Sequence, residues 1–324
     1  MTGERRVTGQ RSKKYDLILD LVYLRKGQGL TTDRMFAAST LQEVCGGGGQ
    51  PLEITRARLV SAIRSLPEAQ GREALLAAYG LRPETKDLPT LANRRGAYGK
   101  RVKRGADTLA DRENAAIREL ALTLLTAYYA GAPLPAQLPV PHGGYLIEYL
   151  NVSTVYLQRR FSEHQQERRI VSLVDGAECF RYHSSDTDSN GRTRVIAVEG
   201  CTVETEYVPG GSLHRLCFPE PISRGDIAEF TFIEKLDDVE SQVVPEEDFA
   251  GQSFETPALV YRQEATFLGG RPPVIWAYHM LSRVGRPGTP ENGELLDFGH
   301  SNTISREFHQ LHGGFFSGIA WRWG

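Results

Sequence analysis

The sequence predicts a two-domain α + β protein, in which an N-terminal all-helical, helix-turn-helix-like domain is followed by an antiparallel β-sandwich. Three observations lead to this prediction. Apolar residues recur at helical spacing in the first part of the chain and at every second position in the last part. A proline-rich stretch separates the two patterns, and the net charge changes sign across it.

The composition supports two domains of opposite charge. The chain has 324 residues and is 40% apolar, which is enough for two cores. Residues 1–142 carry 22 lysines and arginines against 14 aspartates and glutamates, a net charge of +8, whereas residues 143–324 carry 16 against 26, a net charge of -10. The basic half suits an anionic partner such as nucleic acid, and the acidic half does not.

The helical domain is predicted to span residues 15–130, after a basic flexible tail at residues 1–14. Its first four helical segments are expected at residues 15–25, 32–44, 54–66 and 68–79. Glycines mark the ends of several of these segments, and Pro67 separates the last two. The glycine run 46–49 indicates a flexible connection, because it lacks the strand and the Lys-Ser/Thr pair of a phosphate loop.

The segment 88–125 carries the clearest binding signal. It is predicted to form a short basic helix, a glycine-containing turn and a long amphipathic helix. Thr108 and Asp111 have the spacing of a capping box, which places the start of the second helix at Thr108. Apolar residues from Ile117 to Tyr128 recur on one face of this helix. The arrangement is typical of a helix-turn-helix.

The run from Arg94 to Arg104, before the second helix of this segment, holds six positive charges and no negative one. The predicted contacts with DNA phosphates are Arg94, Arg95, Lys100, Arg101, Lys103 and Arg104. We predict contacts with base edges from Thr108 and Arg112. Asp111 and Glu119 argue against DNA binding, because they fall on the face expected to be exposed and would repel phosphates. A solvated or protein-binding surface therefore stays open as the alternative.

Residues 131–144 are predicted to form a Pro-rich linker, and residues 145–324 the β-sandwich domain. Eleven strand-like runs are expected in the second domain, at residues 147–159, 167–174, 178–184, 193–199, 202–208, 212–218, 227–235, 258–267, 273–281, 303–309 and 315–323. Many short strands without interleaved helices favour an antiparallel sandwich over an α/β fold. Asn190-Gly191 predicts a tight hairpin turn between two of these strands.

The cysteines show no CxxC pair, and we expect Cys45, Cys179, Cys201 and Cys217 to be reduced in a cytoplasmic protein. The basic tail lacks the apolar core of a signal peptide. No apolar run approaches the roughly 20 residues that a membrane span needs, so we expect no membrane partner.

Three stretches carry a likeness to known sequences. They are LRKGQGL at residues 24–30, followed by Asp33-Arg34, then TLADREN at residues 108–114, and GIAWRW at residues 318–323. With them the chain resembles a group of uncharacterised bacterial two-domain proteins that join an N-terminal helical, helix-turn-helix-like region to a C-terminal all-β domain. The resemblance implies this architecture and no particular activity.

Two further patterns suggest metal binding, but each has a simpler explanation. Asp186, Asp188 and Asn190 copy the first oxygen ligands of a calcium loop, yet Ala197 occupies the position that needs a bidentate glutamate. An Asx-rich turn explains this segment better, with calcium as the alternative. The candidate histidines for metal or nucleophilic chemistry are His183, His300, His309 and His312. Two of them, at positions 309 and 312, would point to opposite faces of one strand, so we predict no metal and no other cofactor.

No GxSxG, HExxH, Walker or GxGxxG pattern occurs in a supporting context, so we predict no catalytic residues. The sequence favours a non-enzymatic intracellular regulator of transcription. Its helical domain would bind double-stranded DNA, its β-sandwich would bind a ligand or a protein partner, and a homodimer would match paired half-sites. The first alternative is a protein-protein interaction adaptor that does not bind DNA. The second is a β domain that binds a metal or catalyses a reaction.

Overall fold

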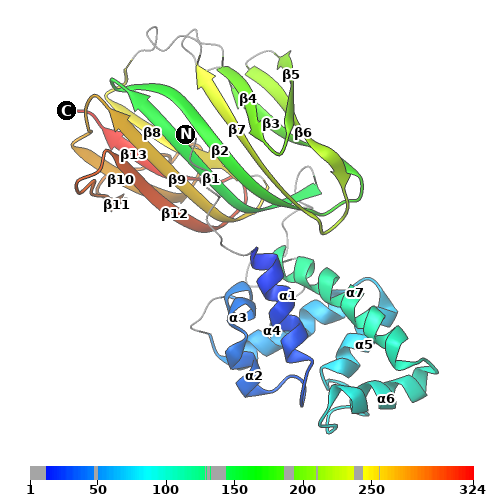
Figure 1. The fold of residues 1–324 in the computed structure, drawn as a ribbon. Coiled ribbons are helices and arrows are strands. Elements are labelled where there is room, and N and C mark those ends of the chain that lie inside the picture. The colour runs from blue at the N-terminus through cyan, green and yellow to red at the C-terminus, as the bar shows by residue number, and fades with distance from the viewer. Residues whose placement is uncertain are drawn as a thin grey trace. The chain divides into compact units, whose positions relative to one another are not determined.

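The computed structural model describes residues 12–46, 50–127, 129, 132, 144–185, 193–208, 211–236, 244–254 and 256–324. The chain divides into two compact units, Met1–Leu138 and Pro139–Gly324. The first holds helices and the second holds strands (Figure 1), which confirms the predicted two-domain α + β layout.

The first unit is built around one long helix. Its helices are α1 (Lys13–Leu24), α2 (Thr32–Ala37), α3 (Ser39–Val44), α4 (Leu52–Ser65), α5 (Ala69–Ala78), α6 (Leu91–Val102) and α7 (Ala106–Leu125). α7 is central because it contacts α1, α4, α5 and α6, and its buried face carries Ile117, Leu120 and Leu124. None of the described helices is long and apolar enough to cross a membrane.

Two details of the predicted helices are wrong. The segment expected as one helix at residues 32–44 is divided at Ala38, whose ψ of 73° leaves the helical region. α7 begins at Ala106, with Gly105 as its N-cap and no capping side chain, so Thr108 is not the predicted capping residue. Thr108 instead lies in the first turn of α7, where its side chain is exposed.

The second unit is built from strands. They are β1 (Tyr145–Leu157), β2 (Arg160–Ser172), β3 (Ala177–Ser185), β4 (Thr193–Glu199), β5 (Thr202–Val208), β6 (Gly211–Ile222), β7 (Ile227–Leu236), β8 (Glu247–Ser253), β9 (Ala258–Leu268), β10 (Val274–Leu281), β11 (Glu294–Leu295), β12 (Thr303–Leu311) and β13 (Phe316–Arg322). The strands β8 and β11 were not predicted. β11 has only two residues, and the EDFAGQS sequence of β8 lacks a clear apolar alternation.

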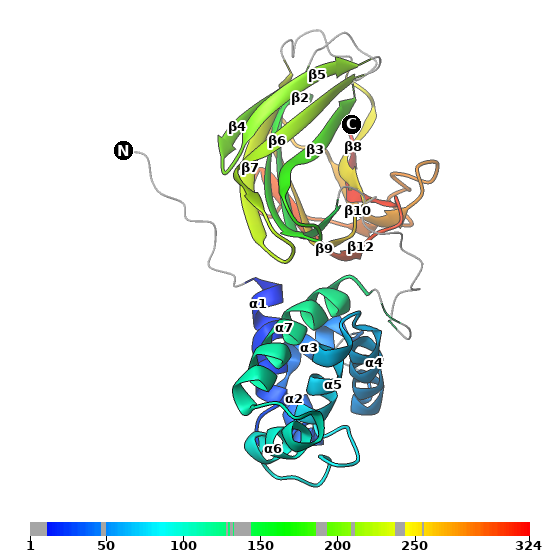
Figure 2. The same cartoon turned by 90° about the vertical axis from the view of Figure 1, so that its right-hand side faces the viewer.

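These strands form a sandwich of two layers. One layer is a six-stranded sheet with the order β12-β9-β1-β2-β7-β4. The other consists of two smaller sheets, β11-β10-β13-β8 and β3-β6-β5 (Figure 2). Trp321 of β13 packs on Tyr156 of β1 with ring centroids 4.6 Å apart, and Phe180 of β3 packs on Phe230 of β7 at 5.6 Å. The three-stranded sheet packs in one apolar cluster and the four-stranded sheet mainly in a second, although Ala277 of β10 belongs to the first.

The pairing of the strands differs from the prediction in two places. Most pairs are antiparallel, but β1 and β9 run parallel to each other. β3 pairs with β6 and β4 pairs with β7, so these two consecutive strands do not form the predicted hairpin. The turn residues proposed for that hairpin, Asn190 and Gly191, lie outside the described residues.

One disulfide corrects the expectation that all four cysteines are reduced. Cys179 of β3 lies opposite Cys217 of β6 in the strand register, and the two form a disulfide. They are 38 positions apart in sequence, so only the pairing of the strands brings them together. Cys45 and Cys201 are free, as expected.

Candidate functional site

Arg94 of α6 points into the helical unit, although the sequence placed it on the phosphate-binding surface. Its side chain is fully buried. Nε donates a hydrogen bond to the carbonyl oxygen of Ala78 at 2.8 Å, and Nη1 donates to those of Gly27 and Leu88 at 2.8 and 2.9 Å. Nη2 donates to the carbonyl oxygen of Arg25 at 2.7 Å. Arg94 therefore satisfies backbone carbonyl groups after α1 and at the end of α5, and it is not available to a phosphate.

Arg95 is also bound within the fold. The carboxylate of Glu113 in α7 is buried, and its two oxygens accept hydrogen bonds from Nε and Nη2 of Arg95 at 2.8 and 2.7 Å. Nη1 of Arg25 donates to the same carboxylate at 3.1 Å. A buried carboxylate of this kind is stable only while its partners are present. The role of Glu113 was not predictable from the sequence, because nothing in a helical pattern marks a carboxylate that will be paired.

The remaining predicted phosphate contacts lie on the surface. Arg101 forms an ion pair with Glu84 at 2.5 Å, but this pair is largely exposed to solvent and therefore weak. Lys100, Lys103 and Arg104 are exposed, and no described acidic residue pairs with them. These three side chains follow one another through the end of α6 and the turn before α7. We call these three residues the exposed basic surface of the helical unit.

Arg104 and Arg112 line one shallow groove of about 330 Å³ on this unit. Glu73 lines it as well, but Glu73 is already paired with Arg72 and Arg82. The structure thus brings together two of the predicted contacts that come from opposite sides of the turn. Acidic side chains border this region, because Asp107 and Asp111 are exposed on the first turns of α7.

The proposed calcium ligands, Asp186, Asp188 and Asn190, lie outside the described residues. Within the described ranges, no group of three or more histidine, cysteine, aspartate or glutamate side chains is placed to hold a metal ion. His309 lines one cleft of the β unit and His183 lines another, whereas His300 and His312 line neither of these two clefts. The histidines near the C-terminus therefore do not form a common site in this part of the structure.

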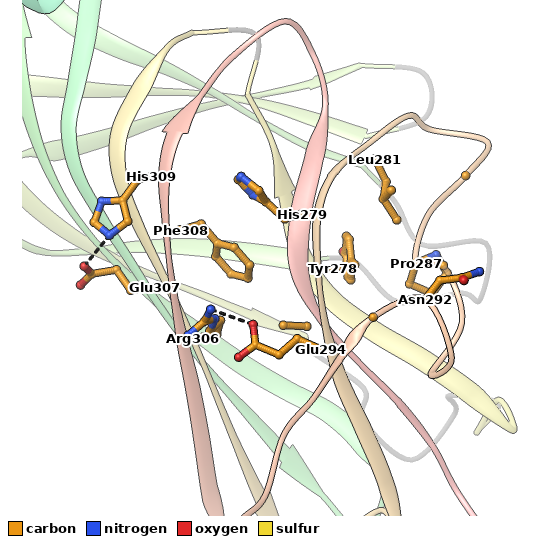
Figure 3. Close-up of a pocket in the computed structure, with 14 residues that line it drawn as sticks. Tyr278, His279, Leu281, Pro287, Asn292, Glu294, Arg306, Glu307, Phe308 and His309 are labelled. Carbon is orange, nitrogen blue, oxygen red and sulfur yellow. Dashed lines mark ion pairs between the residues drawn. The ribbon is translucent and has the colours of Figure 1, made fainter. Parts of the chain in front are cut away.

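One cleft of the β unit, of about 620 Å³, lies between β10, β12 and the chain that follows β10 (Figure 3). Its charged groups are paired with one another. Arg306 contacts Glu294 at 2.7 Å, and Nε2 of His309 contacts Glu307 at 3.1 Å. Burial lowers the pKa of His279, and the positive charges of Arg306 and His309 add to this effect. Since these charges satisfy one another, this cleft offers little to recognise a charged ligand.

A second cleft, of about 590 Å³, opens where the two small sheets of the second layer separate. β8 is an edge strand of the four-stranded sheet, β3 is an edge strand of the three-stranded sheet, and residues of both line the cleft. Its floor comes from β1, β2, β7 and β9 of the large sheet. We call it the β3–β8 cleft. It exists because the second layer is made of two sheets rather than one.

The floor of the β3–β8 cleft holds a buried carboxylate. Glu234 of β7 is 5% exposed, and it accepts hydrogen bonds from the hydroxyl of Tyr182 at 2.6 Å and from that of Ser184. Nε2 of His164 in β2 lies 3.0 Å from the same carboxylate. Burial alone would raise the pKa of Glu234, but His164 and the two hydroxyls outweigh it and lower the pKa to about 2. Glu234 is therefore an anion whose partners the fold already supplies.

A second set of buried polar side chains continues this network below the cleft. Gln166 of β2 accepts a hydrogen bond from Nε of Arg168 at 3.1 Å and donates one to the hydroxyl of Tyr182 at 3.1 Å. Burial lowers the pKa of Arg168 to about 10. Buried polar groups destabilise a fold unless they are hydrogen-bonded, so a core does not need such residues. Their presence under the cleft marks this region as a candidate binding site.

Three charged residues line the β3–β8 cleft and form no ion pair with any described residue: Asp248, Arg159 and Arg286. One carboxylate oxygen of Asp248 accepts a hydrogen bond from the backbone N–H of Phe249 at 2.8 Å. Burial raises the pKa of Asp248 to about 6. The guanidinium of Arg286 lies over the rings of Phe249 and Phe316, at 5.0 and 4.1 Å from their centroids.

Of the residues that line this cleft, the sequence pointed only to His183, which was a candidate for metal or nucleophilic chemistry. The carboxylates and arginines of the cleft were not predicted, although one signal was present. In β7, Phe230 and Phe232 point inward, and the next inward position is Glu234. In β2, Gln166 and Arg168 occupy inward positions before Ile170. A charged residue that continues an apolar alternation indicates a buried polar site, but the alternation alone does not show which strands meet there.

Comparisons with known proteins do not assign the chain to a family. No protein family matches the sequence, and no curated protein matches it. Solved structures that match in part include the M1 zinc metallopeptidase from Deinococcus radiodurans and a mutant of it bound to a Tyr-Ser-Ala substrate. In both cases the identity is 8%, the match covers 56% of this chain and 43% of the other chain, and the TM-score is 0.30. This chain thus spans less than half the length of those proteins, and a likeness this low supports no inference about fold or activity.

Proposed function

We propose that this protein is a non-enzymatic regulator whose helical unit binds double-stranded DNA and whose β unit binds a ligand. The observation that carries the proposal is the exposed basic surface of Lys100, Lys103 and Arg104, for which the described part of the chain supplies no acidic partner. Side chains that are already bound within the fold, such as Arg94 and Arg95, are no longer part of the proposed contact set. The cationic groups that remain face solvent, where they are free to meet phosphates.

The geometry supports contacts with the DNA backbone more than with the bases. Arg112 is half-buried in the groove that it shares with Arg104, so its guanidinium suits an anion held at that groove. The amide groups of the first turn of α7 add a partial positive charge beside it. Asp107 and Asp111 are exposed on the same helix and would repel a closely docked phosphate chain. Thr108 keeps its role as the candidate for a base-edge contact.

A salt series with duplex DNA and the full chain tests this proposal. We expect binding that weakens steeply as salt rises, and a variant with Lys100→Glu, Lys103→Glu and Arg104→Glu to bind about tenfold more weakly or worse with a shallower salt slope. The matched control is the variant with Lys26→Glu, Arg56→Glu and Arg64→Glu, which reverses three exposed charges elsewhere on the unit. Fluorescence anisotropy of a labelled duplex measures the affinity and its salt dependence for both variants.

Two results would count against DNA binding. The first is the absence of binding at low ionic strength. The second is an equal loss in the control variant, because a loss that depends only on net charge does not locate a surface.

A protein-protein adaptor is the second candidate, and one surface favours it. Tyr15, Leu19 and Tyr23 follow one another at four-residue spacing on α1, with exposures of 53%, 42% and 39%. Exposed apolar side chains in a row are typical of protein contact surfaces. This candidate predicts that DNA binding is absent and that the full chain sediments with a mass above the 36.0 kDa of one chain. Leu19→Glu should then return the protein to the mass of a single chain.

A further inference from the structure

Opposite charges line the β3–β8 cleft without pairing to each other. Asp248 is held by its own strand, through the backbone N–H of Phe249. Arg286 is held apart from it by stacking on two aromatic rings, and Arg159 lies over the ring of Trp323 at 5.2 Å from its centroid. Opposite charges that share a small space normally attract one another. Here each is positioned separately. Asp248 and Phe249 are consecutive in β8, so the carboxylate and the guanidinium stacked on Phe249 approach the cleft from opposite faces of this edge strand.

The other charged group of the cleft does not compete for a ligand. The carboxylate of Glu234 already receives hydrogen bonds from Tyr182 and Ser184 and the contact with His164. Only one oxygen of Asp248 has a hydrogen bond from a described residue. Among the cleft carboxylates, Asp248 is therefore the one that is able to accept a cationic group from outside.

We propose that the β3–β8 cleft binds a small zwitterionic molecule, whose ammonium group meets Asp248 and whose carboxylate meets Arg286. A volume of about 590 Å³ suits a small ligand, and the exposed faces of aromatic and aliphatic side chains suit its apolar body. This inference names the site and ligand class for the ligand-binding role proposed for the β unit. It does not depend on DNA binding by the helical unit.

A ligand with a single charge fits the cleft less well. An anion would meet the arginines but would be repelled by Asp248 and by the ionised Glu234. A cation would be attracted by Asp248 but repelled by Arg159 and Arg286. A neutral ligand would remove water from these groups without replacing it by a partner, which costs free energy. A molecule that carries both charges satisfies both ends of the cleft and is selected over the others.

Isothermal titration calorimetry on the full chain tests the proposal with ligands of increasing charge separation. The probes are glycine, 4-aminobutyrate, 6-aminohexanoate and glycyl-leucine, each compared with its N-acetylated form and its C-terminal amide. We expect at least one zwitterion to bind with a dissociation constant below about 1 mM, and each blocked form to bind at least about tenfold more weakly. Binding by none of the zwitterions up to about 10 mM, or equal binding by blocked forms, would overturn it.

Two variants assign the ends of the ligand. Asp248→Asn should weaken binding of the zwitterion about tenfold. Binding of the N-acetylated form, which is already weak, should stay unchanged, because that form has no ammonium group. Arg286→Gln should weaken binding of the zwitterion to the same extent but leave binding of the C-terminal amide unchanged. Glu246→Gln and Arg283→Gln are the controls, since both residues are exposed and lie outside the cleft lining. Equal losses of affinity for the zwitterion and for both blocked forms would contradict the assignment.

The comparison of blocked ligands on the unaltered protein stays informative even if a variant misfolds. It is also separate from the DNA measurement. If no compound binds while duplex DNA does, the zwitterion proposal fails and the DNA proposal stands. If a zwitterion binds and DNA does not, the reverse holds.

Discussion

The two units of this protein deal with charged side chains in different ways. In the helical unit, Glu113 lies between Arg25 and Arg95, and Arg94 is bound by four carbonyl oxygens. In the β unit, Glu234 has a full set of partners, but Asp248, which lines the same cleft, has no ion pair with a described residue. Charges that the fold has satisfied hold the structure together, and charges it leaves unsatisfied are available to a ligand.

The largest effect is expected from Arg94. Arg94→Met keeps an unbranched side chain but removes every donor, which leaves four carbonyl oxygens without this partner. We expect the free energy of unfolding to fall by about 4 kcal/mol, as for other buried charged groups that lose their network. Urea unfolding followed by circular dichroism of the full chain measures this loss.

Lys100→Met is the matched control for Arg94→Met. It lies on the same helix, but its side chain is exposed, so we expect a change within about 0.5 kcal/mol. If Arg94→Met unfolds with nearly the stability of the unaltered protein, the guanidinium of Arg94 is not structural. Its place in the phosphate-binding set would then have to be restored.

Glu234 should give an intermediate effect with a clear pH dependence. Glu234→Gln removes the negative charge beside His164 but still offers an oxygen to the two hydroxyls, so we expect a loss of about 2 kcal/mol at neutral pH. The pKa of Glu234 is lowered from 4.5 to about 2 in the folded state, so its contribution is present above pH 4.5 and is lost as the pH falls toward 2. Urea midpoints at several pH values measure this.

The difference between the unaltered protein and Glu234→Gln should therefore shrink as the solution becomes more acidic. Glu229→Gln is a control on the same strand, because its side chain is exposed. A difference that grows toward low pH would mean that the folded protein does not hold Glu234 as an anion. The network under the cleft would then need a different description.

The sequence predicted the architecture well because the architecture depends on periodicity. The helical face of α7 and the alternation in β7 and β13 are repeated over many positions, and one misread residue does not change them. The inward direction of Arg94 was not predictable in the same way. A single arginine in a basic run looks the same whether its partners are phosphates or carbonyl groups from α1 and α5.

The β3–β8 cleft was missed for two further reasons. β8, which carries Asp248, has the sequence EDFAGQS, and its glycine and polar residues hide the strand pattern. The cleft also depends on which strands lie at the edges of the small sheets, and β3 and β4 enter different sheets although they are consecutive. Strand pairing of this kind arises from contacts far apart in the sequence, so local patterns do not reveal it.

Asp248 should give the smallest effect, and with the opposite sign. Burial raises the pKa of Asp248 from 3.8 to about 6, so the folded state holds a proton that the unfolded chain releases. Stability that depends on Asp248 is therefore lost as the pH rises from 3.8 to 6. Asp248→Asn has nearly the same shape and cannot ionise. Because Asp248 is partly exposed, we expect this variant to be more stable by about 1 kcal/mol above pH 6, and no different near pH 4.

Thermal unfolding across this pH range measures the gain, with Glu246→Gln as the control that should not change. A variant that is less stable than the unaltered protein at neutral pH would show that Asp248 has a partner in the fold and belongs with Glu113 and Glu234. A more stable variant that no longer binds a zwitterion would mean that this carboxylate destabilises the fold and is retained for its ligand. Stability and zwitterion binding of this variant together show whether Asp248 stabilises the fold or serves a ligand.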